Sequence, residues 1–314
     1  MRVLLRRVAF GIGTLVFVSL LIFAGTHLLP GDVAEVVLGQ DATPQTLTAF
    51  RHDAGLDRPL YTQYLTWVSG ALHGNLGKSY ASGRSVSALI ASRLPATLLL
   101  GGLTALVALP LAVALGLYAA ARAGTWPDRL ITNTSLITAS GPEFMFAAFL
   151  ILVFSVQLGW LPATSYMFGE VTLGSHLRRL ALPVMTLVIS VFAPTTRMTR
   201  SSILNVLGSP YVEMALLKGV PRSRILVRHA LPNAIGPIAN VIGISLGYLV
   251  SGVVVVEVIF SYAGMGKLMI DSVAVRDLPL VQGCAMVFGT IYVGLNMATD
   301  LLALAGSPRL RSRT

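Results

Sequence analysis

Ionised side chains and cysteine are both scarce in this sequence. Only 11% of its 314 residues are charged, whereas 54% are hydrophobic, and the mean hydropathy is +0.76. A soluble domain carries charge on about a quarter of its residues. The composition therefore excludes a soluble domain. The single cysteine, Cys284, lies in an apolar stretch, which excludes a disulfide scaffold and predicts a small packing residue.

Recognisable catalytic and metal-binding patterns are missing too. The sequence contains no zinc-ligand cluster and no Ser/His/Asp set. Residues 73–79 (HGNLGKS) approach the phosphate-binding pattern G-x-x-x-x-G-K-[ST], but Leu72 stands where the first glycine is required, and no buried strand precedes the motif. We therefore expect no catalytic residue, no metal and no cofactor on this chain.

Six long apolar runs dominate the chain instead. A helix needs about 20 apolar residues to cross the hydrocarbon core of a bilayer. We expect the first run to stay in the mature chain, because it is longer than the apolar core of a signal peptide and no A-x-A-like site follows it. The sequence predicts an all-α polytopic membrane protein with six transmembrane helices, at 8–29, 95–121, 130–158, 180–196, 230–256 and 278–299.

Lys and Arg are unevenly divided between the two sides of these spans. The side that holds both termini carries 14 Lys and Arg residues and two acidic residues. The other side carries nine Lys and Arg residues and eight acidic residues. Because cytoplasmic loops are enriched in Lys and Arg, we expect cytoplasmic N- and C-termini. The net charge of +10 then reflects topology and contact with anionic membrane lipid, and we expect no nucleic-acid partner.

The link between the first two spans is long and has its own helices. It is rich in Pro, Gly and turn pairs, with helical stretches at 44–53 and 59–72. The predicted topology places this link outside the cytoplasm. The sequence therefore predicts three parts: an N-terminal end with the first span (1–29), a small extracytoplasmic subdomain (30–94) and a five-span core (95–314).

The link between the fourth and fifth spans contains two short helices at about 209–229. Ser209 and Pro210 fit an N-cap and a first helical position. Gly219 ends the first helix, and the second lasts until Pro232 opens the fifth span. The pattern alone leaves two interpretations open: a knob that binds a partner, or a hairpin on the membrane surface that snorkels its arginines.

The same link resembles the cytoplasmic signature of the inner-membrane permease subunits of ABC importers. That signature is a Glu-Ala-Ala-like stretch, a Gly and an apolar-x-Leu-Pro ending, with Met214 here replacing the middle alanine. The matching positions are Glu213, Ala215, Gly219, Leu231 and Pro232. Further motifs are similar to the dipeptide/oligopeptide/nickel branch, in order along nearly the whole chain: LRR (5–7), LLPGD (28–32), GLDRPLYTQYLTW (55–67), GNLGKSY (74–80), RLPATL (93–98), GWLPA (159–163), VVVEVIF (254–260), GMGKL (264–268) and RDLPLVQG (276–283).

The resemblance implies a transport subunit rather than an enzyme. In such importers two homologous permeases form the pathway, two ATPase subunits supply ATP and Mg²⁺ chemistry, and an extracytoplasmic binding protein delivers substrate. It implies a bacterial inner-membrane permease for short peptides, with nickel or glutathione-like cargo as alternatives. The residues implied to couple to the ATPase are Tyr211, Glu213, Ala215, Gly219, Leu231 and Pro232.

Three acidic residues lie at membrane depth, where a charge is costly and marks a functional candidate. Glu143 follows Ser140-Gly141-Pro142, a pattern typical of a broken helix that restarts at Pro142. Glu143 can cap that helix, line the pathway together with Pro142, or do both. Glu257 is a pathway candidate that can also sit at the outer interface, and Asp300 is expected near the inner surface.

A secondary transporter is the main alternative class. It would relay protons or bind an ion through Glu143, Glu257 and Asp300 without ATP. Such carriers usually have two repeated halves with matching broken helices, and the sequence shows no such repeat. A membrane-bound enzyme is disfavoured, because no paired catalytic residues occur in the spans.

Overall fold

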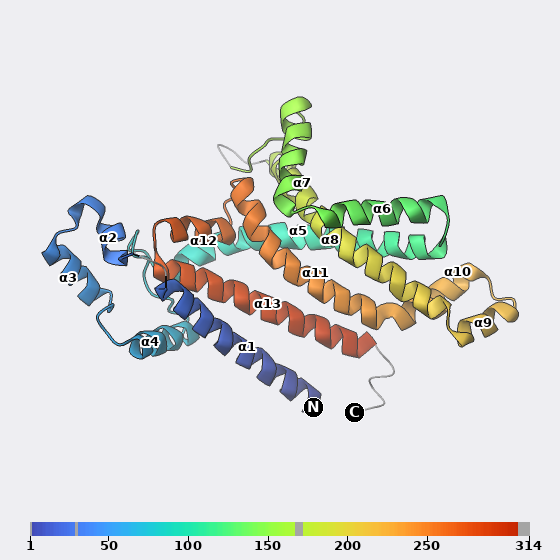
Figure 1. Cartoon of the computed structure of the whole chain (residues 1–314), viewed down its shortest axis with the longest axis horizontal. Coiled ribbons are helices and arrows are strands. Elements are labelled where there is room, and N and C mark those ends of the chain that lie inside the picture. The colour runs from blue at the N-terminus through green and yellow to red at the C-terminus, as the bar shows by residue number, and fades with distance from the viewer. Residues whose placement is uncertain (1, 29–30, 167–171, 307–314) are drawn as a thin grey trace. The chain divides into compact units, whose positions relative to one another are not determined.

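The regular structure is helical in the residues that the computed structural model describes, which are 2–28, 31–166 and 172–306 (Figure 1). Positions 29–30 of the LLPGD motif and the basic C-terminal residues 307–314 lie outside this part. The elements are α1 (Arg2–His27), α2 (Val33–Leu38), η1 (Gly39–Asp41), α3 (Pro44–Asp53), α4 (Leu60–Leu72), α5 (Val86–Ala121), α6 (Trp126–Ser140), α7 (Glu143–Leu150), η2 (Ile151–Gln157), α8 (Leu173–Leu207), α9 (Pro210–Leu217), α10 (Arg222–Ile225), η3 (Leu226–Ala230), α11 (Leu231–Ile259), α12 (Met265–Ala274) and α13 (Leu278–Gly306).

Five helices of the described chain are long and apolar enough to cross a membrane. They are Leu5–His27, Val86–Ala121, Gly174–Leu207, Leu231–Ile259 and Leu278–Leu301. A sixth crossing results if α6 and the α7–η2 helix, which meet at 105°, form one broken span. The all-α polytopic architecture is confirmed. This bent pair covers the third predicted span at 130–158, and its break agrees with the broken helix that Ser140-Gly141-Pro142 predicts.

Two of the spanning helices are much longer than their apolar runs. Helix α5 begins at Val86, nine residues before the predicted span at 95–121, and α8 covers 35 residues against 17 predicted at 180–196. A helix rises 1.5 Å per residue, so the 36 residues of α5 extend about 54 Å. That length exceeds the ~30 Å hydrocarbon core, so hydropathy marks only the part that crosses lipid.

Contacts group the chain into two compact units. The first unit contains Met1–Leu98 and Ala263–Val293, and the second contains Leu99–Tyr262 and Gly294–Thr314. Helices α5 and α13 each have residues in both units. The division into 1–29, 30–94 and 95–314 follows from the sequence pattern and stays a prediction.

The core of the first unit joins α5, α12 and α13. Its fully buried centre consists of Val86, Ile90, Met265, Leu280 and Cys284. A Cβ at the neighbouring Gly283 would lie 2.7 Å from Val86 Cγ1, so the glycine permits close packing of α13 on α5. Cys284 is therefore the packing residue that its apolar context predicts.

The core of the second unit is the contact between α8 and α11, which run side by side (Figure 1). Near their 209–229 end, a buried cluster of Ala120, Ile203, Ala230, Ala234 and Ile238 joins them to α5 and η3. Small residues allow these backbones to approach closely, as is usual between helices in lipid.

Gly116 permits a close approach between α5 and α8. A Cβ at this position would lie 2.7 Å from the Thr196 carbonyl oxygen and 2.7 Å from Thr199 Cβ. We expect Gly116→Leu to cost about 1–3 kcal/mol of stability through overpacking. The matched control is Gly102→Leu on the same helix, where a Cβ meets nothing within 4 Å. Thermal unfolding in detergent measures both, and equal melting temperatures would contradict the packing argument.

Candidate functional site

The 209–229 segment has the helix–turn–helix form that its sequence predicts. Helix α9 starts at Pro210, after Ser209 in extended conformation, but the Ser209 hydroxyl donates to the Val206 carbonyl at 2.5 Å instead of capping α9. Gly219 has φ +77°, a left-handed conformation that side chains disfavour. The Val220 N–H donates to the Ala215 carbonyl at 3.1 Å and closes the turn.

The second half of the segment differs from the prediction. Helix α10 does not stop before the fifth span, because Ile225 and Leu231 keep right-handed helical angles through the π-helical turn η3. Pro232 therefore lies inside a continuous helical path rather than opening a new helix. Its missing N–H cannot bond to the Arg228 carbonyl, which is consistent with a widened turn at this point.

The segment is anchored on one face and exposed on the other. Val212 and Ile225 are each only 1% exposed. On the opposite face, the apolar side chains of Tyr211, Met214 and Leu217 are 41%, 55% and 78% exposed, respectively. Three-residue spacing places them in one row. Large apolar side chains that gather on an exposed surface mark a contact with another protein or with the membrane surface.

The other predicted coupling residues lie around this row. Glu213 is exposed beside it and Gly219 is exposed at the turn, whereas Ala215 is half-buried. Leu231 is half-buried and Pro232 exposed at the start of α11. One end of the second unit therefore brings together the residues that the signature singles out.

Glu143 and Pro142 lie at the break between α6 and α7. Pro142 holds the N-cap position with extended angles, and Glu143 is the first residue of α7, one residue later than the predicted restart. A cavity of about 370 Å³ opens at this break within the second unit. Its lining comes from α6, α7, α8 and α11 and includes Gly141, Pro142, Glu143, Ser190, Pro194 and Tyr248.

Glu257 and Asp300 do not line this cavity. Glu257 is fully buried in the second unit rather than exposed at an interface. The Tyr262 N–H donates to its backbone carbonyl at 2.8 Å, and burial, followed by the charge of Glu257, raises the pKa of Tyr262 to about 12. Asp300 is exposed on α13.

Motifs that are far apart in the sequence meet inside the first unit. Asp277, from RDLPLVQG, is buried, and it accepts from the Ser79 hydroxyl and from the Tyr80 N–H, the latter at 3.0 Å. The loop that imitates a phosphate-binding motif thus uses its serine to bind a carboxylate of its own chain. The Met265 N–H of GMGKL likewise donates to Thr97 of RLPATL at 2.7 Å.

The LLPGD motif is part of the same arrangement. Asp32 caps α2 by accepting from the Ala34 N–H at 2.9 Å, and it pairs with Arg51 of α3. The hydrogen bond from Arg51 lowers the pKa of Asp32. Gly31 has φ +103°, and its lack of a side chain leaves room for the Arg276 guanidinium. A Cβ at position 31 would clash with that group.

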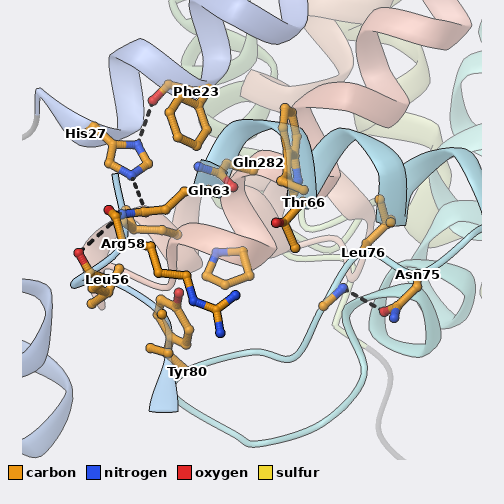
Figure 2. Close-up of a pocket in the computed structure, with 17 residues that line it drawn as sticks. Phe23, His27, Leu56, Arg58, Gln63, Thr66, Asn75, Leu76, Tyr80 and Gln282 are labelled. Carbon is orange, nitrogen blue, oxygen red and sulfur yellow. Dashed lines mark hydrogen bonds between the residues drawn. The ribbon is translucent and has the colours of Figure 1, made fainter. Parts of the chain in front are cut away.

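The first unit also contains a pocket of about 260 Å³ (Figure 2). Phe23 and Trp67 stack in its wall with ring centroids 6.3 Å apart. His27 contacts the Phe23 carbonyl and Gln63 at 2.9 and 3.2 Å, respectively. Arg58 is the one Asp, Glu, Lys or Arg among the lining residues, and its side chain extends beside Tyr80 in Figure 2.

One ion pair of the second unit is absent from the sequence-based expectations. Arg200 Nε and Nη2 donate to the two carboxylate oxygens of Asp128 at 2.5 and 2.7 Å, which ties α8 to α6. The Asp128 side chain is only 4% exposed. The sequence held one indication of this ion pair: on the predicted cytoplasmic side, Asp128 and Glu213 are the only acidic residues.

Comparison with known proteins explains the fold and the shared motifs. Residues 112–312 match the model of the family described as binding-protein-dependent transport system inner membrane component, and residues 1–101 match the model of its N-terminal part. The chain belongs to this family. It is therefore an ABC importer permease of the peptide/nickel branch, a multi-pass protein of the inner membrane.

Relatives match this permease over almost its entire length. The glutathione transport system permease protein GsiC of Shigella flexneri serotype 5b (strain 8401) is 37% identical over 300 residues, which cover 96% of this chain and 95% of the relative. GsiC of Escherichia coli (strain K12) matches with the same identity and coverage. A Brucella abortus (strain 2308) protein named for peptide transport system permease activity is 36% identical over 309 residues, 98% of each chain.

The Asp277 contacts of the permease give a stability prediction. We expect Asp277→Ala to cost about 1–3 kcal/mol, because it leaves the buried Ser79 hydroxyl and the Tyr80 N–H without their acceptor. Asp271→Ala is the control: Asp271 makes an exposed pair with Lys267, a type worth about 0.5 kcal/mol or less. Limited proteolysis of the 73–85 loop measures both variants, and equal protection would disprove the predicted role of Asp277.

Proposed function

We propose that this permease forms one half of the pathway of an ATP-driven importer. The other half is a second, non-identical homologous permease. Two ATPase subunits hold ATP and Mg²⁺ at the cytoplasmic face, and an extracytoplasmic protein delivers the substrate. Both termini and the 209–229 segment face the cytoplasm in this arrangement, as the uneven distribution of Lys and Arg supports.

The exposed row on α9 carries the proposal. A short helix that is buried at Val212 but exposes Tyr211, Met214 and Leu217 has one face for its own chain and one for a partner. The ATPase grips this row together with Glu213, while Ala215 keeps the approach close. Gly219 fixes the angle between the two short helices, and Leu231 and Pro232 pass the movement to α11.

The segment can act as a lever because it is continuous with two spanning helices. Helix α9 follows α8 after a turn of two residues, and α10 runs through η3 into α11. When the ATPase subunits close, a push on α9 therefore tilts α8 and α11 as rigid elements. Such rigid-body movement of packed helices is a common switching mechanism. The cavity at Pro142 and Glu143 borders these same helices, and we assign both residues to the pathway, with the buried Glu257 as a further candidate.

Short peptides are the proposed substrates, and glutathione is a specific alternative. The Brucella relative is named for peptide transport and the Shigella and Escherichia relatives for glutathione transport. Glutathione is itself a short peptide with free ammonium and carboxylate groups, so the two substrates share most of their chemistry. The delivering protein selects between them.

We predict that Glu213→Lys and Gly219→Leu uncouple transport from ATP hydrolysis. The introduced lysine would reverse a charge at the ATPase contact, and a side chain at φ +77° would reorient the turn. Uptake and substrate-stimulated ATP hydrolysis should each fall at least about tenfold, the effect of losing contacts worth about 1.4 kcal/mol. The assembled complex should still be recovered by affinity purification.

The control for the glycine variant is Gly124→Leu. Gly124 also has a positive φ, +83°, and a Cβ there meets nothing within 4 Å, so it reproduces the backbone strain outside the 209–229 segment. It should retain uptake. Normal uptake and ATP hydrolysis in both the Glu213 and the Gly219 variants would refute the assigned coupling role.

Orientation can be tested with two exposed positions. Leu72 is 82% and Trp126 is 72% exposed, whereas the native Cys284 is fully buried. In spheroplasts, a membrane-impermeant maleimide should label the Leu72→Cys variant at once. It should label the Trp126→Cys variant only after permeabilisation. The reverse pattern would invert the topology and place the 209–229 segment outside.

A further inference from the structure

The cavity at the α6–α7 break contains one carboxylate and no basic residue. Glu143 is the only Asp, Glu, His, Lys or Arg among its lining residues; the others are apolar or carry neutral polar groups, such as Thr138, Leu187 and Tyr248. No Lys or Arg forms an ion pair with Glu143 within the described ranges. An acid at membrane depth is costly unless a partner, water or a proton compensates for its charge, so Glu143 would stabilise a cation that enters this cavity.

The surrounding backbone is shaped to hold this carboxylate in place. A Cβ at Gly252 of α11 would lie 2.7 and 2.8 Å from the two Glu143 carboxylate oxygens. Any larger residue would therefore displace the group. Ser190 of α8 lines the same cavity, and its hydroxyl donates to the Thr186 carbonyl at 3.4 Å. Three helices thus position one negative charge, and Tyr248, 64% exposed, lies at the accessible edge of the cavity.

We propose that Glu143 binds the free ammonium group of the substrate as it passes through the permease. This inference rests on the proposed function and specifies the substrate chemistry of its pathway. A primary ammonium is compact and has three donors, which match a carboxylate and a hydroxyl. A divalent metal fits worse, because Ca²⁺ needs six to eight oxygen ligands and Mg²⁺ an octahedral set. The apolar lining accommodates the side chain next to the ammonium.

Cysteine labelling tests the charge of the cavity directly. In purified permease complex, the Tyr248→Cys variant should react at least about fivefold faster with aminoethyl methanethiosulfonate than with sulfonatoethyl methanethiosulfonate, after correction for intrinsic reactivity, because a local negative potential concentrates cations. Adding Glu143→Gln should abolish this preference, and Glu143→Asp should retain it. A preference that is unchanged in Glu143→Gln, or absent when Glu143 is present because a partner's base neutralises it, overturns the proposal.

The matched control is Trp160→Cys, another exposed position of the second unit. Trp160 is 58% exposed and lies beside Arg178, whose Nε donates to the Trp160 carbonyl at 2.9 Å. Its charge preference should be opposite or absent, and Glu143→Gln should not change it. A parallel change at both positions would indicate a general structural effect and would also overturn the proposal.

Substrate protection tests the ammonium itself. Millimolar trialanine should slow labelling of the Tyr248→Cys variant, and N-acetyl-trialanine, which lacks the ammonium, should not. The difference should vanish with Glu143→Gln, whereas equal protection by both peptides overturns the inference. ATP-dependent peptide uptake by the wild-type complex is measured separately. Intact uptake with charge-insensitive labelling refutes the Glu143 assignment alone, whereas a lack of ATP-driven uptake refutes the proposed function.

Discussion

Close backbone contact between helices is the constraint on which the second unit depends. Lipid removes most of the hydrophobic gain from helix association, so packing of small residues must hold the helices together. Gly116 meets α8, Gly243 meets Thr299 of α13, and Gly252 meets Glu143 of α7 at distances that a Cβ does not allow. These contacts hold α5, α13 and α7 against the packed pair of α8 and α11, and that pair carries both the 209–229 segment and the cavity.

The sequence predicts the features of this permease that arise from local chemistry. The third helix of the described chain begins at Pro44 and ends at Asp53, as its turn residues indicate, because capping and proline geometry act within a few residues. Gly219 was expected to end a helix, and its left-handed backbone has the same local origin. The break before Glu143 was predictable for the same reason, although its 105° bend depends on packing against α8.

Features that depend on distant contacts were beyond sequence reasoning. Ser79 and Asp277 are separated by 198 positions, and a single sequence contains no signal that they meet. Glu257 was a pathway candidate that could also sit at the outer interface because it ends an apolar run, and only tertiary packing shows that it is completely buried. Residues 209–229 were recognisable as a site through the family signature, whereas the cavity required the helices around Glu143 to be placed first.

The π-helical turn η3 gives the path between α10 and α11 one residue more than a regular α-helix would use. Each residue turns an α-helix by about 100°. The number of residues in η3 therefore fixes the rotation of α10 about the helix axis relative to α11. Loss of a single residue would rotate α10 relative to α11 without altering any other residue of either helix. Evolution of this junction is therefore constrained in length as well as in composition, and insertions or deletions here should be rarer than substitutions.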